Sequence, residues 1–203
     1  MKRRKIGIMG GTFNPIHYGH LMLGETAYEQ FGLDQVLIMP AKNPYYKNIS
    51  SNIKEENRVA MIQLAIEDNP HFCFSDVVLK RSGNTYTVDT LDELTKAYPD
   101  VDFYFILGAG SLYHIESWKD PAKILALAKI VAASRADSYS AIDAQIEYLN
   151  DKYDAQVLRL NSPNLEISSS YLRKQIELGR SCRYLLPDAV LHYIKEHKLY
   201  EKR

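Results

Sequence analysis

Short apolar runs alternate along the chain with stretches in which apolar residues recur every three or four positions. The runs predict buried strands at residues 6–9, 36–39, 72–74, 103–107, 130–132 and 157–160. Most of these runs lack the alternation of apolar and polar residues that marks a strand with one face in water. We therefore predict that both faces of the sheet are covered, as in parallel sheets.

The segments between the runs carry helical spacing. They predict helices at residues 18–31, 58–67, 88–98, 124–128, 140–153, 168–178 and 188–196, with a polar loop at 42–57. Strands that alternate with helices predict an α/β fold with a Rossmann-like, doubly wound parallel sheet. No internal repeat or linker divides the chain, so we predict one domain over 1–203, whose last part, about 165–203, is a small helical appendage.

Composition and charge narrow the class of protein. The chain has 203 residues, of which 46% are hydrophobic, and its 25 basic side chains balance its 25 acidic ones. A general affinity for nucleic acid or a membrane surface is therefore not expected, and no apolar stretch approaches the roughly 20 residues of a membrane span. Cys73 and Cys182 lie far apart and outside any zinc-type spacing, which predicts buried, reduced thiols in a cytoplasmic protein.

A first cluster of candidate ligand-binding residues, GGTFNPIHYGH at 10–20, directly follows the first predicted strand. Ligands of doubly wound sheets bind beyond the carboxyl ends of the strands. Gly10 and Gly11 allow close approach of a ligand, and the next helix offers free N–H groups to phosphate. His17 and His20 share one helical face. The cluster predicts a phosphate site, whereas a metal site is weaker because no third ligand is within reach in the sequence.

A second cluster, ISSSYLR at 167–173, stands at the start of a predicted helix. Serines at this position cap free N–H groups. The same serines, Ser168 and Ser169, can bind phosphate oxygens, and Arg173 can grip them bidentately. A plain serine-rich cap followed by a solvated arginine is the alternative interpretation of this segment.

The two clusters together resemble the signatures of a known family. GGTFNPIHYGHL, at 10–21, resembles the (Thr/His)-x-Gly-His signature of nucleotidyltransferases, and most of all that of the bacterial nicotinate-nucleotide adenylyltransferases. The segment 167–173 resembles the second signature of this superfamily, and 184–187 and 192–194 resemble its C-terminal end. The resemblance therefore spans nearly the whole chain. It implies transfer of the adenylyl group of ATP to nicotinate mononucleotide in NAD biosynthesis, with Mg²⁺ carried on the ATP phosphates and no metal site made by the protein.

The resemblance also assigns roles to residues. It implies direct roles in catalysis for Thr12, His17, His20 and Arg173. It implies binding of ATP or its phosphates by Gly10, Gly11, Phe13, Lys47, Gly108, Gly110, Ser168 and Ser169.

The middle of the chain bears on the acceptor. The segment NTYTVDTL, at 84–91, looks like the Ser-Tyr-Thr-x-x-Thr-Leu segment of the family, in which N–H groups around Tyr86 and Thr87 would receive the pyridine carboxylate. The family likeness also implies that Trp118 stacks on the pyridine ring and that Arg135 lies near the ligand. An ordinary helix cap and a tryptophan in the core or at the rim of the fold are the structural alternatives.

Two positions depart from the family pattern. The expected Gly-x-Asp-Ser reads Gly108-Ala109-Gly110-Ser111, so the carboxylate that would meet the adenosine ribose is missing, and Tyr46 stands where a histidine is expected. A different acceptor (nicotinamide mononucleotide or phosphopantetheine) and a weakened or non-catalytic nucleotide-binding relative therefore stay open. A fragment of a class I aminoacyl-tRNA synthetase fits less well, because the chain lacks both a Lys-Met-Ser-Lys-like loop and a basic excess. The sequence leaves open whether the chain forms a homo-oligomer.

Overall fold

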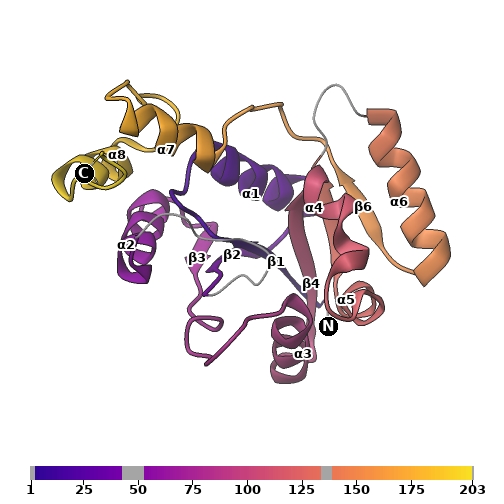
Figure 1. The fold of residues 1–203 in the computed structure, drawn as a ribbon. Helices are drawn as coiled ribbons and strands as arrows, with labels where there is room; N and C mark the ends of the chain where they lie inside the picture. Colours follow the sequence, from indigo (N-terminus) through magenta and orange to yellow (C-terminus); the bar gives the residue numbers. More distant parts are fainter. Residues whose placement is uncertain (1–2, 43–52, 134–138, 203) are drawn as a thin grey trace.

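A computed structural model describes residues 3–42, 53–133 and 139–202 (Figure 1). Its strands form one six-stranded parallel sheet in the order β3-β2-β1-β4-β5-β6. The strands are β1 Arg4–Gly11, β2 Gln35–Pro40, β3 Phe72–Phe74, β4 Val101–Gly108, β5 Lys129–Ala133 and β6 Val157–Leu160. The chain runs outward from β1 to β3 and then returns to place β4 on the other side of β1. This reversal confirms the predicted doubly wound fold.

The helices fill the connections between the strands. They are α1 Tyr18–Phe31, α2 Glu55–Ile66, α3 Thr87–Ala97, α4 Ala109–Tyr113, α5 Pro121–Leu127, α6 Tyr139–Tyr153, α7 Ser169–Glu177 and α8 Asp188–Glu196, with a 3₁₀ turn η1 at Ile115–Ser117. The sequence prediction missed α4 and η1, which are too short for a helical repeat to show. It also began α2 too late, because Glu55 and Glu56 look like loop residues although acidic groups favour the first turn of a helix.

Each face of the sheet has its own apolar core. Along β1, Met9 packs into the first core and Ile6 and Ile8 pack into the second, and along β4 Ile106 packs into the first core and Phe105 into the second. Helices α1, α2, α7 and α8 supply the first core, and α3 to α6 the second. The central parts of β1, β2 and β4 are apolar because both faces of the sheet are buried there, as the sequence pattern predicted.

The C-terminal helices complete the first core. Leu172 of α7 and Val190 and Ile194 of α8 are buried with the apolar side chains of α2. Figure 1 shows α8 beside α2, and the Tyr193 hydroxyl donates a 2.9 Å hydrogen bond to Asn57 Oδ1 at this contact. The helical C-terminal part therefore shares a core with the strands that carry the first cluster.

The sequence predicted two buried, reduced thiols and no membrane span. Cys73 and Cys182 are both unpaired thiols, as expected. Cys73 is only partly buried, which corrects the expectation of two buried cysteines. The reason is that β3 is an edge strand and leaves one side of this residue uncovered. Within the described ranges, no helix combines the length and apolar content that crossing a bilayer requires.

Candidate phosphate and acceptor site

The candidate site lies where the carboxyl ends of β1 and β4 meet, at the reversal of strand order. A pocket of about 100 Å³ opens here. Five of the predicted site residues line it: Gly10, Gly11, Tyr86, Thr87 and Trp118. The first cluster and the predicted acceptor-binding segment, separated by more than 60 positions in the sequence, thus share one pocket. Phe105 and Leu107 of β4 add an apolar wall that the sequence analysis did not assign to the site.

Gly11, which lines the pocket, packs against the ring of Phe13. A Cβ atom on Gly11 would lie 2.9 Å from Cζ of the Phe13 ring, so the ring requires glycine at this position. Phe13 itself is only 1% exposed, and its ring meets the His20 ring edge-on at 5.0 Å. The buried side chain of Phe13 is therefore not available to bind ATP directly. Its side chain supports His20, and contact with a phosphate would have to come from its backbone.

The two histidines of the first cluster lie together at the start of α1. Their rings are stacked with centroids 3.8 Å apart, which confirms that they share a face. The backbone N–H of His17 donates to Nδ1 of His20 over 3.3 Å. A nitrogen that accepts a hydrogen bond carries no proton, so neutral His20 has its proton on Nε2. His20 can therefore donate a hydrogen bond from Nε2 to an anionic oxygen.

His17 is the more buried of the pair. It caps the N-terminus of α1 and is only 5% exposed. Burial lowers its pKa to about 4, so the ring is neutral at pH 7. Its Nδ1 is buried and has no hydrogen-bond partner among the described residues. A Cβ on Gly19 would lie 3.0 Å from this nitrogen, which explains the glycine between the two histidines.

The lowered pKa of His17 predicts a pH-dependent stability. Because the folded pKa of about 4 lies below the unfolded value of 6.5, the unfolded chain binds more protons between these two pH values. The stabilisation is complete above pH 6.5 and is lost as the pH falls through 4, by about 3 kcal/mol. Urea unfolding of the wild type and of His17→Gln at pH 7 and pH 4.5 measures this. A shallower loss of stability in the variant is expected, and parallel losses would contradict the account.

The second cluster contacts the first. Ser168 caps α7 by accepting a 3.2 Å hydrogen bond from the backbone N–H of Tyr171. Ser169 donates from its hydroxyl to the Pro15 carbonyl at 2.9 Å. Arg173 donates from Nη1 to the Asn14 carbonyl at 2.8 Å. The two signatures, about 150 residues apart in the sequence, are therefore brought side by side at the loop between β1 and α1.

Two side chains that the sequence did not single out hold the same loop: Tyr200, which is partly buried, and Arg58, which is buried. The Tyr200 hydroxyl donates to Asn14 Oδ1 at 2.6 Å, and burial raises the pKa of Tyr200. Arg58 of α2 is 2% exposed and donates from Nη1 to the carbonyls of Thr12 and Ala41, at 2.8 and 2.9 Å. An arginine among the core-facing positions of a predicted helix was the available signal for Arg58. The signal for Tyr200 was absent, because its partner lies at the far end of the sequence.

Replacing Arg58 with methionine is expected to lower the free energy of unfolding by about 1–3 kcal/mol. The substitution leaves the buried carbonyls of Thr12 and Ala41 without their donor. Chemical denaturation measures the change, and Arg58→Lys, which keeps a donor at this position, is expected to lose less. An unchanged denaturation midpoint for Arg58→Met would show that these two hydrogen bonds contribute nothing.

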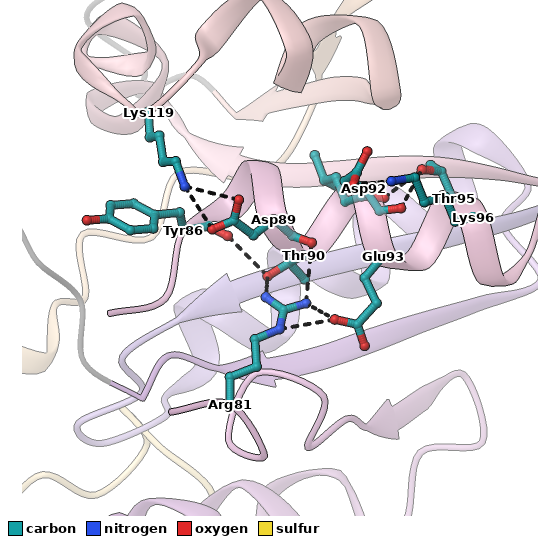
Figure 2. A network of polar contacts seen from close by, with 10 residues as sticks. Arg81, Tyr86, Asp89, Thr90, Asp92, Glu93, Thr95, Lys96 and Lys119 are labelled. Atoms are coloured by element: carbon teal, nitrogen blue, oxygen red, sulfur yellow. Dashed lines mark hydrogen bonds and ion pairs between the residues drawn. The ribbon is translucent and has the colours of Figure 1, made fainter. Parts of the chain in front are cut away.

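The predicted acceptor-binding residues Tyr86 and Thr87 lie at the N-terminus of α3. Tyr86 is the N-cap residue and supplies no side-chain cap, and Thr87 is the first helical residue. Figure 2 shows Tyr86 beside Lys119, whose Nζ lies 4.5 Å from the centre of the tyrosine ring. Trp118 stands edge-on to Phe105 with ring centroids 6.2 Å apart. An uncapped helix N-terminus beside aromatic rings suits a ligand that carries both a carboxylate and a flat ring.

The end of β4 carries the departure from the family pattern. Gly108 is the N-cap of α4, and Gly110 lies in its first turn. Neither glycine lines the pocket, but Ser111 does. A Cβ on Gly110 would meet no atom within 4 Å, so the structure has room for a larger side chain there. The predicted residues Lys47 and Arg135, together with Tyr46, lie outside the described residues.

Comparison with known proteins decides the family. The sequence profile of the cytidylyltransferase-like family matches residues 8–175. The chain is 52% identical over 198 residues to the "Probable nicotinate-nucleotide adenylyltransferase" of Lachnoclostridium phytofermentans, covering 97% of this chain and 99% of that one. The chain belongs to the nicotinate-nucleotide adenylyltransferases. It is therefore an enzyme of the nucleotidyltransferase class. A protein of the same name from Synechococcus sp. (strain JA-2-3B'a(2-13)) is 42% identical, with 98% of each chain covered.

Solved structures agree with the fold of this nicotinate-nucleotide adenylyltransferase. The nicotinic acid mononucleotide adenylyltransferase of Plasmodium falciparum superposes with a TM-score of 0.79 in its complex with NaAD and 0.77 in its complex with APC. Each alignment covers 97% of both chains, at 22% and 21% identity. At this identity the likeness establishes the fold, which is the doubly wound fold that the strand order shows.

Proposed function

We propose that this protein transfers the adenylyl group of ATP to nicotinate mononucleotide, giving deamido-NAD and pyrophosphate in NAD biosynthesis. One observation carries the proposal. The pocket joins the glycine turn of Gly10 and Gly11 to the uncapped N-terminus of α3 and to Trp118. The glycine turn, which can face phosphate, thus lies next to the start of α3 and Trp118, which can receive a flat ring with a carboxylate.

The reaction is an in-line displacement at the α-phosphorus of ATP. The 5′-phosphate of nicotinate mononucleotide attacks, the bond to the bridging oxygen breaks, and pyrophosphate leaves. A phosphate monoester dianion is already nucleophilic, so catalysis consists mostly of positioning and charge stabilisation. Thr12 orients the attacking phosphate. His17 and His20 donate hydrogen bonds to oxygens on which negative charge builds up.

The leaving group is held by the second cluster. Ser168, Ser169 and Arg173 bind the β- and γ-phosphates from the start of α7, and by resemblance Lys47 adds a further positive charge. Mg²⁺ carried on the ATP phosphates supplies charge neutralisation. The described residues contain no group of three His, Cys, Asp or Glu side chains that could hold a metal ion. Mg²⁺ prefers phosphate and water oxygens as ligands, so it would be brought in on ATP.

The proposal also covers the domain organisation, the remaining site residues and the cellular location. Residues 1–203 act as one nucleotidyltransferase domain, in which the helical part from about 165 carries the second phosphate motif. The likeness to the family implies that Gly108 and Gly110 lie beside the adenosine of ATP and that Arg135 lies beside the acceptor mononucleotide. The protein works in the cytoplasm with small-molecule substrates and without nucleic acid or membrane, and a homo-oligomer is compatible with this role.

Steady-state release of pyrophosphate tests the proposal. Purified protein receives ATP and Mg²⁺ with nicotinate mononucleotide, nicotinamide mononucleotide or phosphopantetheine in parallel reactions. The proposal expects the highest kcat/KM with the acid mononucleotide, because the N-terminus of α3 attracts a carboxylate. A higher kcat/KM with either of the other acceptors would contradict the acceptor assignment.

A further inference from the structure

Arg81, in the loop before α3, forms hydrogen bonds with residues in the first two turns of that helix (Figure 2). Its Nη1 donates to Thr90 Oγ1 at 2.8 Å, and its Nε donates to Glu93 Oε2 at 3.0 Å. Its Nη2 reaches the Asp89 carbonyl at 3.4 Å. The Arg81 side chain is only 22% exposed, and its partner Thr90 is buried, although Glu93 is more than half exposed. The guanidinium group is therefore fixed against the N-terminal part of α3.

A chain of hydrogen bonds runs from Arg81 through the Thr90 hydroxyl to the Tyr86 carbonyl. The Thr90 hydroxyl accepts from Arg81, so its own proton is directed elsewhere, and the Tyr86 carbonyl lies 3.2 Å away. The same carbonyl accepts the backbone N–H of Thr90 at 3.3 Å. Thr90 is buried and lines the pocket. Arg81 thus acts through Thr90 on Tyr86, the N-cap residue of α3.

Two lysines hold the segments next to this turn. Lys119 places Nζ over the Tyr86 ring and pairs with Asp89 at 3.1 Å. Lys42, just beyond the end of β2, donates from Nζ to the carbonyls of Leu79 and Arg81, each at 2.8 Å. Lys42 thereby links the loop that carries Arg81 to the C-terminal end of β2. The Tyr86 carbonyl is accordingly held by Thr90, which lines the pocket, and Thr90 is held in turn by Arg81, which does not.

We propose that Arg81 is a positioning residue for the acceptor. It holds the N–H groups of the Tyr86–Thr87 turn in the orientation that receives a carboxylate, so discrimination between acid and amide mononucleotides depends on it. This inference rests on the proposed function, in which that turn binds the pyridine carboxylate. Arg81 itself does not line the pocket, and its effect is expected on acceptor binding rather than on phosphoryl chemistry.

Arg81→Met is expected to raise the KM for nicotinate mononucleotide about 10-fold, the scale of one well-placed hydrogen bond. The KM for ATP and the kcat should stay within about twofold, because binding of the acceptor is weakened while the reacting groups are untouched. The preference for acid over amide should fall by the same factor. Thr90→Val should reproduce these effects, and Thr90→Ser, which keeps the hydroxyl, should restore the wild-type values.

Lys96→Met is the matched control. It removes the 2.7 Å ion pair with Asp92 on the same helix, farther from the pocket, and should leave all three constants unchanged. Equal changes in Arg81→Met and Lys96→Met, or a rise in the KM for ATP alone, would overturn the inference.

Amide hydrogen exchange separates this inference from the proposed function. The Thr90 amide, whose acceptor is the Tyr86 carbonyl, should exchange about 10-fold faster in Arg81→Met than in the wild type or in Lys96→Met, at equal global stability. Unchanged exchange at this amide would overturn the positioning role. A wild-type protein that does not use nicotinate mononucleotide would defeat the proposed function, and the exchange rates would still decide whether Arg81 orders the turn.

Discussion

Replacing His20 with alanine is expected to lower kcat about 100- to 1,000-fold, the usual cost of losing one donor to the developing charge of a transition state. The His20 ring is held for this task. Its Nδ1 accepts from the His17 backbone, so Nε2 carries the proton that a phosphate oxygen can accept. The ring is further fixed by stacking on His17 and by the edge of Phe13. Single-turnover rates with ATP and nicotinate mononucleotide measure the effect on the chemical step.

His192→Ala serves as the control for this experiment. His192 is exposed on α8 and belongs to neither cluster, so the wild-type rate is expected for its variant. A His20→Ala protein that retains near-normal turnover would remove His20 from the mechanism.

Gly110→Asp is expected to raise kcat/KM for ATP by roughly 10- to 150-fold. A hydrogen bond to a charged group contributes about 1.5–3 kcal/mol, which converts to a change of that size. The structure allows the substitution because no atom lies within 4 Å of the position of a Cβ on Gly110. An aspartate there also sits in the first turn of α4, where a negative charge is favoured. The added carboxylate would meet the ribose hydroxyls that the family likeness places at this strand end.

Gly110→Ala and Gly110→Asn are the matched controls. Alanine adds a Cβ without a polar group and should give no gain. Asparagine adds a neutral group of the same shape and should give a smaller gain than aspartate. Equal kcat/KM values for the wild type and all three variants would mean that the chain binds adenosine without a carboxylate at this position.

The fold was largely predictable from sequence because its signals are local. Each buried strand shows itself as an apolar run, such as 103–107, and alternation with helices leaves few topologies for a parallel sheet. The expectation failed where an element is short or its signal mixed. The five residues of α4 hold no full helical repeat, and the acidic start of α2 has the composition of a loop.

The candidate site was only partly predictable because much of it depends on contacts between distant segments. The glycine turn, the paired histidines and Trp118 stood out as residue types in a recognisable order. Nothing local in the sequence showed that Arg173 would hold the Asn14 carbonyl, or that Tyr200 would reach the Asn14 side chain. Such pairings arise from the packing of α7 and α8 into the first core, which a single sequence does not reveal.

The central claim is the transfer of an adenylyl group to the acid mononucleotide. The most direct test follows the α-phosphate of ATP, labelled with ³²P, after incubation of the protein with Mg²⁺ and nicotinate mononucleotide. The account predicts that the label leaves ATP and appears in deamido-NAD, with one pyrophosphate released for each dinucleotide formed. A label that stays in ATP, or that appears in AMP without a dinucleotide, would contradict it.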